Sequence, residues 1–91
     1  MRLYQLEIPK TVRRQIDSLS GRYRQRIKAI IQSLRTDPRP DNTKLLREKQ
    51  QVYRIALDEY RIVYSIDDDV LIVEVVKVGR KYGPEFYADI E

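Results

Sequence analysis

The segment QVYRIALDEYRIVYSI, residues 51–66, decides the fold of this chain because its hydrophobic pattern has the period of a β-strand. Apolar and polar residues alternate through residues 51–57 and again through residues 60–66. Alternation with a period of two is typical of strands that bury one face. Only Asp58 and Glu59 separate the two runs, and so short a connection predicts an antiparallel hairpin.

The chain then continues into VLIVEVVKV, residues 70–78, which is the most apolar segment of the sequence. The acidic triplet at residues 67–69 predicts a second turn in front of it. Its many β-branched residues favour a strand in a central or doubly covered position of a sheet. Three consecutive strands with short turns predict an antiparallel meander.

Upstream of the meander, the pattern predicts one strand and two amphipathic helices. Residues 2–8 alternate like a strand, and Pro9 then suits the first turn of a helix, where no amide donor is needed. An apolar stripe at helical spacing follows, formed by Val12, Ile16 and Leu19. The pair Ser20-Gly21 ends this helix, and a second helix is expected over residues 22–34.

The remaining segments predict a loop and a short tail. TDPRPDNT, residues 36–43, contains two prolines and no apolar residue, which is typical of a loop. The tail after Gly79 predicts one or two helical turns. Together the elements predict an α+β fold of order β-α-α-β-β-β, with a helical hairpin on one face of a small antiparallel sheet and a short C-terminal segment. We expect a single domain over residues 1–91.

Composition excludes several classes of chemistry. The sequence has neither Cys nor His, so it offers no disulfide, no thiolate nucleophile and no imidazole base or ligand. No apolar run is long enough to span a bilayer, and no signal-peptide core precedes the first strand. We therefore expect a cytoplasmic protein without contact to a membrane.

The positive charge lies mainly in the first part of the chain. The net charge is +4, residues 1–35 carry nine Lys and Arg against two acidic residues, and residues 67–91 carry three against seven. Arg outnumbers Lys twelve to six, and its guanidinium forms paired hydrogen bonds with phosphate or carboxylate. A basic half indicates nucleic acid or an acidic protein as partner, although Arg-rich helices are also found as ordinary solvated faces.

Strand alternation places two arginines on the face of the sheet away from the helices. The apolar residues of the hairpin share one face, which leaves Arg54 and Arg61 on the other. The segment after residue 78 adds Arg80, Lys81 and Tyr87 to the rim of that open face.

A simpler interpretation makes these residues ordinary surface and packing groups. The two strand arginines would form surface ion pairs with nearby acidic residues, namely Glu48, Glu59 or Glu74, and the aromatic residues of the tail would only pack. The pattern alone leaves both interpretations open.

The segment YRIALDEYRIVYSIDDDVLIVEVVKVG resembles the core of the RelE/ParE superfamily of toxins from bacterial type II toxin–antitoxin pairs. The preceding helical hairpin, the loop with DPRPDNTKL and the tyrosine near the end also follow the family order. RelE-like members cleave mRNA in the ribosomal A site, whereas ParE-like members poison DNA gyrase. The spacing from Gly79 to Tyr87 resembles the RelE-like branch.

The resemblance implies a catalytic role for four residues. Arg61 of YRIVY matches the arginine that holds the phosphate in the transition state, Arg80 and Lys81 match the basic pair after the last strand, and Tyr87 matches the C-terminal tyrosine. A Lys within a cationic cluster gives up its proton more readily, so Lys81 is the candidate base. Tyr87 would stack on a base or position the 2′-OH. The implied RNA-binding residues are Arg54, Lys77 and Tyr82.

The chain departs from the RelE-like pattern at two positions. Ala56 stands where a second strand cation is expected, and Lys81 stands where an Arg is expected unless Arg80 takes that role. These departures predict a slower nuclease, or one that relies more on the other cations. A carboxylate, Glu74, is a weaker alternative base.

We expect an endoribonuclease without metal or other cofactor, since the guanidinium groups supply the charge. The expected partners are the ribosome, mRNA and a cognate antitoxin with an acidic toxin-binding segment. A ParE-like gyrase inhibitor and a non-enzymatic RNA- or antitoxin-binding module remain the alternatives.

Overall fold

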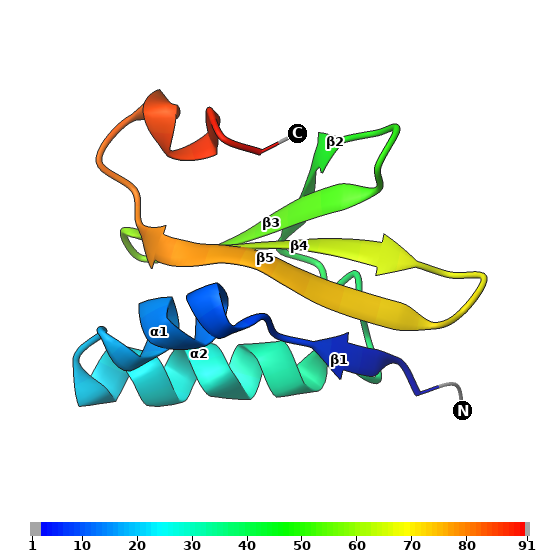
Figure 1. Ribbon diagram of the computed structural model, residues 1–91, viewed down its shortest axis with the longest axis horizontal. Helices are drawn as coiled ribbons and strands as arrows, with labels where there is room; N and C mark the ends of the chain where they lie inside the picture. The colour runs from blue at the N-terminus through cyan, green and yellow to red at the C-terminus, as the bar shows by residue number, and fades with distance from the viewer. Residues whose placement is uncertain (1–2, 91) are drawn as a thin grey trace.

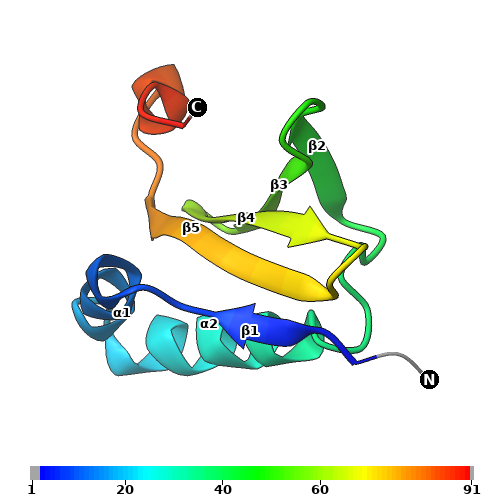
Figure 2. The same cartoon turned by 45° about the vertical axis from the view of Figure 1, so that its right-hand side comes forward.

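A computed structural model describes residues 3–90, in which two helices cover one face of a five-stranded sheet (Figure 1). A short C-terminal segment lies on the opposite side of the sheet, and Figure 2 shows the same three layers from a second direction. In chain order the elements are β1 (Gln5–Glu7), α1 (Lys10–Asp17), α2 (Gly21–Ser33), β2 (Thr43–Arg47), β3 (Val52–Leu57), β4 (Tyr60–Asp67), β5 (Ile72–Arg80) and the 3₁₀ turn η1 (Pro84–Tyr87).

The sheet has the strand order β1-β5-β4-β3-β2. The predicted meander is confirmed, because β3, β4 and β5 pair antiparallel in sequence. The predicted α+β fold, with the helical hairpin on one face of the sheet, is also confirmed. The sheet is mostly antiparallel, and the exception is β1, which pairs with β5 in parallel with Leu6 opposite Val73. The helical hairpin between β1 and the meander acts as the crossover that a parallel pair requires. β5 is therefore flanked on both sides, which agrees with its apolar composition.

The strand β2 was not predicted, because its segment was divided between a polar loop and an unassigned stretch. It pairs antiparallel with β3 and forms one edge of the sheet, with a register shift between Leu45 and Arg47. Its side chains are mostly exposed, so the segment lacks the alternation that identifies half-buried strands. Main-chain pairing with β3 rather than side-chain burial holds it in place.

Both predicted helices are present with boundaries close to those expected. Val12 and Ile16 of α1, together with Ile27 and Ile31 of α2, are buried against the sheet. Pro9 immediately precedes α1 and Ser20 immediately precedes α2, and both residues have an extended backbone. Strand β1 is shorter than the strand predicted over residues 2–8, of which residue 2 lies outside the described residues.

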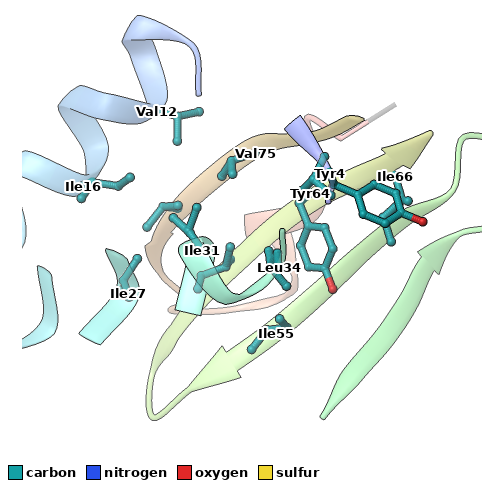
Figure 3. Packing of buried hydrophobic residues seen from close by; sticks show 13 residues of the cluster. Tyr4, Val12, Ile16, Ile27, Ile31, Leu34, Ile55, Tyr64, Ile66 and Val75 are labelled. Carbon is teal, nitrogen blue, oxygen red and sulfur yellow. The ribbon is translucent and has the colours of Figure 1, made fainter. Parts of the chain in front are cut away.

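The core between helices and sheet is formed by the face that strand alternation predicted. Ile55, Tyr64 and Ile66 of the strands belong to one buried cluster with the helix residues Ile27 and Ile31 (Figure 3). Tyr64 is fully buried although it carries a hydroxyl group. This hydroxyl donates to the carbonyl oxygen of residue 38 at 2.7 Å and lies 3.0 Å from the hydroxyl of residue 43. Burial raises the pKa of Tyr64 to about 12. The phenol thereby ties the polar loop to the core.

A β-bulge changes the alternation within β5. Val75 pairs with Tyr64, but the next pair along β4 joins Val63 to Lys77, so Val76 is the extra residue. Because of this extra residue, Val75 and Val78 both face the helices although they are three positions apart. The strand was expected to end at residue 78, but it continues through Gly79 to residue 80.

The face away from the helices is partly covered, whereas the sequence predicted that it would be open. Phe86 and Ile90 of the C-terminal segment pack on Val52 and Val63, and these four residues form a second apolar cluster. The Nζ of Lys77 donates to the carbonyl oxygen of Phe86 at 2.7 Å and to the carboxylate of residue 89 at 3.0 Å. The same amine lies 4.2 Å from the centre of the Phe86 ring. Lys77 thus holds the C-terminal segment on the sheet.

Replacing Tyr64 by Phe should lower the free energy of unfolding by about 1 kcal/mol, because the carbonyl oxygen of residue 38 loses its buried donor. Chemical denaturation followed by circular dichroism measures this change. Tyr82→Phe is the matched control, since Tyr82 is 81% exposed and should leave stability unchanged. Equal midpoints for the wild type and Tyr64→Phe would contradict the assigned role of the hydroxyl.

Lowering the pH should release the C-terminal segment from β5. The hydrogen bond from Lys77 lowers the pKa of Asp89 below its ordinary value of 3.8. Because the folded-state pKa is depressed, the contribution of this pair is complete above the ordinary value and is lost as the pH falls through the lowered one. The amide NMR signals of Phe86 and Ala88 during an acid titration report this release.

Asp89→Asn is the control for this titration. It should weaken the attachment already at neutral pH and remove the pH dependence of the two amide signals. If the variant titrates like the wild type, a different carboxylate holds the segment.

Candidate functional site

The face of the sheet away from the helices carries a basic residue on each of three neighbouring strands. Arg54 of β3 lies opposite Val63 of β4, and Lys77 of β5 lies opposite the same residue. Arg61 of β4 lies between Ala56 of β3 and Gly79 of β5. Paired residues of an antiparallel sheet share a face, so these cations lie on the side that alternation predicted for the two arginines.

Tyr87 lies among the cations of this face. The guanidinium carbon of Arg54 is 5.7 Å from the centre of its ring, and the Nζ of Lys81 is 6.0 Å from it. The Phe86 ring packs edge-on against the Tyr87 ring at a centroid distance of 5.3 Å. The electron-rich ring stabilises two neighbouring positive charges without a carboxylate. We call Arg54, Arg61, Lys81 and Tyr87 the basic cluster.

Arg61 is held by hydrogen bonds to the main chain. Its Nη1 donates to the backbone carbonyl oxygens of Asp58 and Tyr60, each at 2.9 Å. Its Nε is buried and makes no hydrogen bond to the described part of the chain. The Tyr87 hydroxyl is likewise buried without a partner among residues 3–90. Unpaired buried donors are uncommon in folded proteins and are frequent at sites that bind a ligand.

The small neighbours of Arg61 give this arginine different surroundings on its two sides. A side chain at Gly79 would place its Cβ 3.3 Å from the Phe86 ring, so the ring would have to shift by a few tenths of an ångström. On the other side, Ala56 of β3 is exposed and carries no charge.

Arg80 and Tyr82 lie outside the basic cluster. Arg80 pairs with Tyr60, whose ring contacts Tyr23 of α2, so Arg80 belongs to the helix side of the sheet. It forms an ion pair with Glu59, which raises its pKa above the ordinary value, and it lies 5.1 Å from the ring of Tyr82. The sequence placed Arg80 on the rim of the opposite face, and the bulge in β5 is the reason for the difference.

Lys77 also differs from the free cation that the sequence suggested, because it holds the C-terminal segment. The candidate base Glu74 lies opposite Ser65 and beside Glu7 of β1, several residues along the strand from Arg61. The alternative of surface ion pairs fails for the two strand arginines. Within residues 3–90, none of the four ion pairs involves either of them; the pairs are Arg26–Asp58, Arg39–Asp68, Lys77–Asp89 and Arg80–Glu59.

The sequence gave no role to the turn residues that surround the cluster. The Asp58 carbonyl oxygen accepts from Arg61, and the Glu59 carbonyl oxygen accepts from the Lys81 amide at 2.8 Å. Asp58 also has a positive φ of 54°, which a two-residue hairpin turn favours. An Asp in so short a connection is the sequence signal that could have drawn attention to it. Phe86 was considered a packing residue, and its place over Gly79 depends on a register that the sequence does not reveal.

Neither a metal site nor a membrane span accompanies the cluster in the described part of the chain. Among residues 3–90, no group of three or more His, Cys, Asp or Glu side chains could hold a metal ion. No helix in that range is both long and apolar enough to cross a bilayer.

Comparisons with known proteins agree with this fold. The curated relative "Putative toxin RelE1" from Methanocaldococcus jannaschii is 28% identical over 83 residues, covering 88% of this chain and 92% of its own length. A mutant of the E. coli toxin RelE in the free state superposes with a TM-score of 0.78 at 27% identity, over 96% of this chain and 93% of that one.

Two complexes also contain similar chains. The intact E. coli RelBE toxin–antitoxin complex matches with a TM-score of 0.74 at 27% identity, over 88% of this chain and 99% of that one. The archaeal RelE–RelB complex from Pyrococcus horikoshii matches in fold with a TM-score of 0.79 at 22% identity, over 88% and 97% of the two chains.

A sequence profile of the family described as "ParE toxin of type II toxin-antitoxin system, parDE" matches residues 6–82. The match includes both helices and all five strands except part of β1, and it ends before Tyr87. This protein is therefore a toxin of a type II toxin–antitoxin system and belongs to the ParE toxin family, within the RelE/ParE superfamily.

Proposed function

We propose that this chain is an endoribonuclease that cleaves mRNA on the ribosome and thereby inhibits translation in the cytoplasm. The observation that carries the proposal is the basic cluster, in which three cations and a tyrosine share one face without an acidic partner among residues 3–90. Cations without acidic partners repel one another, so their proximity does not stabilise the free protein. A phosphate bound between them would be strongly stabilised. The similarity to RelE toxins supports the same conclusion.

The proposed reaction uses the RNA's own 2′-hydroxyl as nucleophile. A bond forms between the 2′-oxygen and the adjacent phosphorus, while the bond from phosphorus to the 5′-oxygen breaks. Lys81 acts as the general base and takes the proton of the 2′-hydroxyl at Nζ, and the leaving 5′-oxygen takes a proton from solvent. Negative charge increases on the phosphate oxygens in the transition state, where Arg61 compensates it.

The other two members of the basic cluster bind the RNA. The Tyr87 ring lies near two cations and would offer a surface on which an unpaired base stacks. Arg54 on the neighbouring strand contacts the RNA backbone. The chemistry needs no metal ion, because the cations supply the positive charge at the phosphate.

Arg80, Lys77 and Tyr82 take smaller parts in this proposal. Arg80 and Lys77 are engaged with carboxylates, and Tyr82 lies beside Arg80 on the helix side. We therefore assign the main work of the basic pair after the last strand to Lys81. A lysine lacks the bidentate fork of an arginine, so we expect slower cleavage than with an arginine at that position.

We further propose that the natural partner is an antitoxin whose binding segment is acidic and partly apolar. Two of the relatives of known structure were solved as RelB–RelE complexes. In this chain, a hollow of about 350 Å³ lies along the two helices, with Ile16 and Ile31 as its apolar lining and Arg13 and Lys28 at its basic positions. Acidic residues flanking an apolar side chain would match this surface.

Inhibition of DNA gyrase is the second candidate function, because the matching family is described as ParE toxin. In that function the basic cluster would serve protein contact only, and no RNA would be cut. Intact mRNA combined with growth arrest by a well-folded chain would favour gyrase, which a supercoiling assay then tests directly.

Primer extension on a reporter mRNA in a purified translation system tests the nuclease function. The wild type should cut within translated codons, and Arg61→Ala should lower the rate by about 100-fold or more, because a transition-state contact to the phosphate is lost. Arg80→Ala is the matched comparison, an arginine of the next strand that points to the other face. It should lower the rate by roughly tenfold at most.

Circular dichroism confirms that each variant folds. Equal losses in the two variants would mean that the Arg80 side chain leaves Glu59 and reaches the RNA, which contradicts the assignment to Lys81. Full activity of Arg61→Ala would remove the basis for the nuclease reaction proposed here.

A further inference from the structure

The turn between β3 and β4 holds two members of the basic cluster through its main chain. One hydrogen bond from the Arg61 Nη1 ends within this turn, at the carbonyl oxygen of Asp58, and the other ends at the carbonyl oxygen of Tyr60, the first residue of β4. The Glu59 carbonyl oxygen receives the backbone amide of Lys81, from which the candidate base extends. A shift of the turn would therefore move the phosphate-binding cation and the base together.

Helix α2 in turn holds the turn in place. The Tyr23 hydroxyl donates to the Asp58 carboxylate at 2.8 Å, and this contact raises the pKa of Tyr23 above its ordinary value. Arg26, one helical turn further along, places its Nη1 3.9 Å from the same carboxylate oxygen. The Tyr23 ring also packs on the ring of Tyr60, with a centroid distance of 4.5 Å. These contacts fix the turn from the helix side of the sheet.

The backbone of Asp58 makes this support necessary. Its φ of 54° lies in the left-handed region, which is unfavourable for residues other than glycine, although Asp and Asn tolerate it best. The carbonyl oxygen that receives Arg61 belongs to this residue. The side-chain contact to Tyr23 thus stabilises the conformation that directs the carbonyl toward the guanidinium.

The hydrogen bonds of Arg61 leave two nitrogens of its guanidinium without a partner. A guanidinium has five N–H donors in one plane, and the two carbonyl oxygens occupy the Nη1 position. Neither Nε nor Nη2 donates to any group among residues 3–90. Nε is buried, so Nη2 is the donor left for a phosphate oxygen. Because the group is planar, fixing Nη1 also fixes the direction of Nη2.

We propose that Asp58 is a positioning residue, which uses its contact with Tyr23 of α2 to orient the Arg61 guanidinium so that Nη2 faces the RNA phosphate. Asp58 itself touches no reacting atom. The kinetic consequence of this inference rests on the proposed nuclease function. The orientation of the Arg61 guanidinium does not depend on that function.

Four variants test the chain of contacts. Tyr23→Phe removes the donor to the carboxylate, and Asp58→Gly removes the carboxylate while it keeps the left-handed backbone accessible. Asp58→Asn retains an acceptor oxygen and tolerates positive φ, so it should restore the function. Tyr53→Phe is the matched control, because its hydroxyl makes a hydrogen bond of 2.7 Å to residue 51, outside the turn.

The kinetic measurement is the rate of mRNA cleavage as a function of toxin concentration, with thermal unfolding recorded for each variant. Tyr23→Phe and Asp58→Gly should lower the rate at saturation about fivefold and leave the half-saturating concentration unchanged. The reason is that a misdirected Arg61 guanidinium weakens mainly its contact to the phosphate in the transition state. Asp58→Asn and Tyr53→Phe should react like the wild type.

The structural measurement is the ¹⁵N NMR signal of the Arg61 Nε–H group, assigned by its loss in Arg61→Lys. The wild type and Asp58→Asn should show a rigid signal, whereas Tyr23→Phe and Asp58→Gly should show increased motion in its relaxation.

Three results would overturn the inference. These are a wild-type rate and signal in Tyr23→Phe, an Asp58→Asn variant as slow as Asp58→Gly, or a Tyr53→Phe variant as slow as Tyr23→Phe. If the wild type leaves mRNA intact, the proposed function and the kinetic role fail, and the Arg61 signal alone then decides whether Asp58 orients the guanidinium.

Discussion

The bulge in β5 is the constraint on which the rest of this structure depends. One extra residue, Val76, lets the strand bury valines under the helices both before and after it. The same shift turns Lys77 and Gly79 to the opposite face, where the lysine binds the C-terminal segment and the glycine admits the ring of Phe86. A strand without the bulge would point these two residues at the helices, and Tyr87 would lose its place beside the cations.

The two faces of the sheet serve different purposes. The helix side is packed with apolar residues, and its one fully buried phenol has hydrogen-bonding partners. The other side is only partly covered and carries Arg54, Arg61 and Lys81, none of which forms an ion pair within residues 3–90. Such an arrangement lowers stability, and it persists because the core on the helix side and the small second cluster around Phe86 compensate for it.

The sequence predicted the elements with strong periodicity and missed the features that depend on tertiary register. Helices α1 and α2, the three-stranded meander and the face that carries Arg54 and Arg61 follow directly from apolar spacing. Strand β2 was missed because an exposed edge strand needs no apolar alternation. The face of Arg80 was missed because simple alternation does not include a bulge, and nothing in the segment VVKV marks the extra residue. The turn at Asp58 was identified, but its contact with Tyr23 joins residues 35 positions apart and has no local signal.

The parallel pairing of β1 with β5 has a consequence for the order in which the chain folds. The first strand finds its partner only after the helical hairpin and the other three strands have been synthesised. Until then the apolar sides of both helices have no complete sheet to cover, and closure over so long a loop is slow. A nascent chain on the ribosome would therefore expose its basic hairpin before the residues of the basic cluster come together. The basic cluster would be complete only after the residues up to Tyr87 have been synthesised.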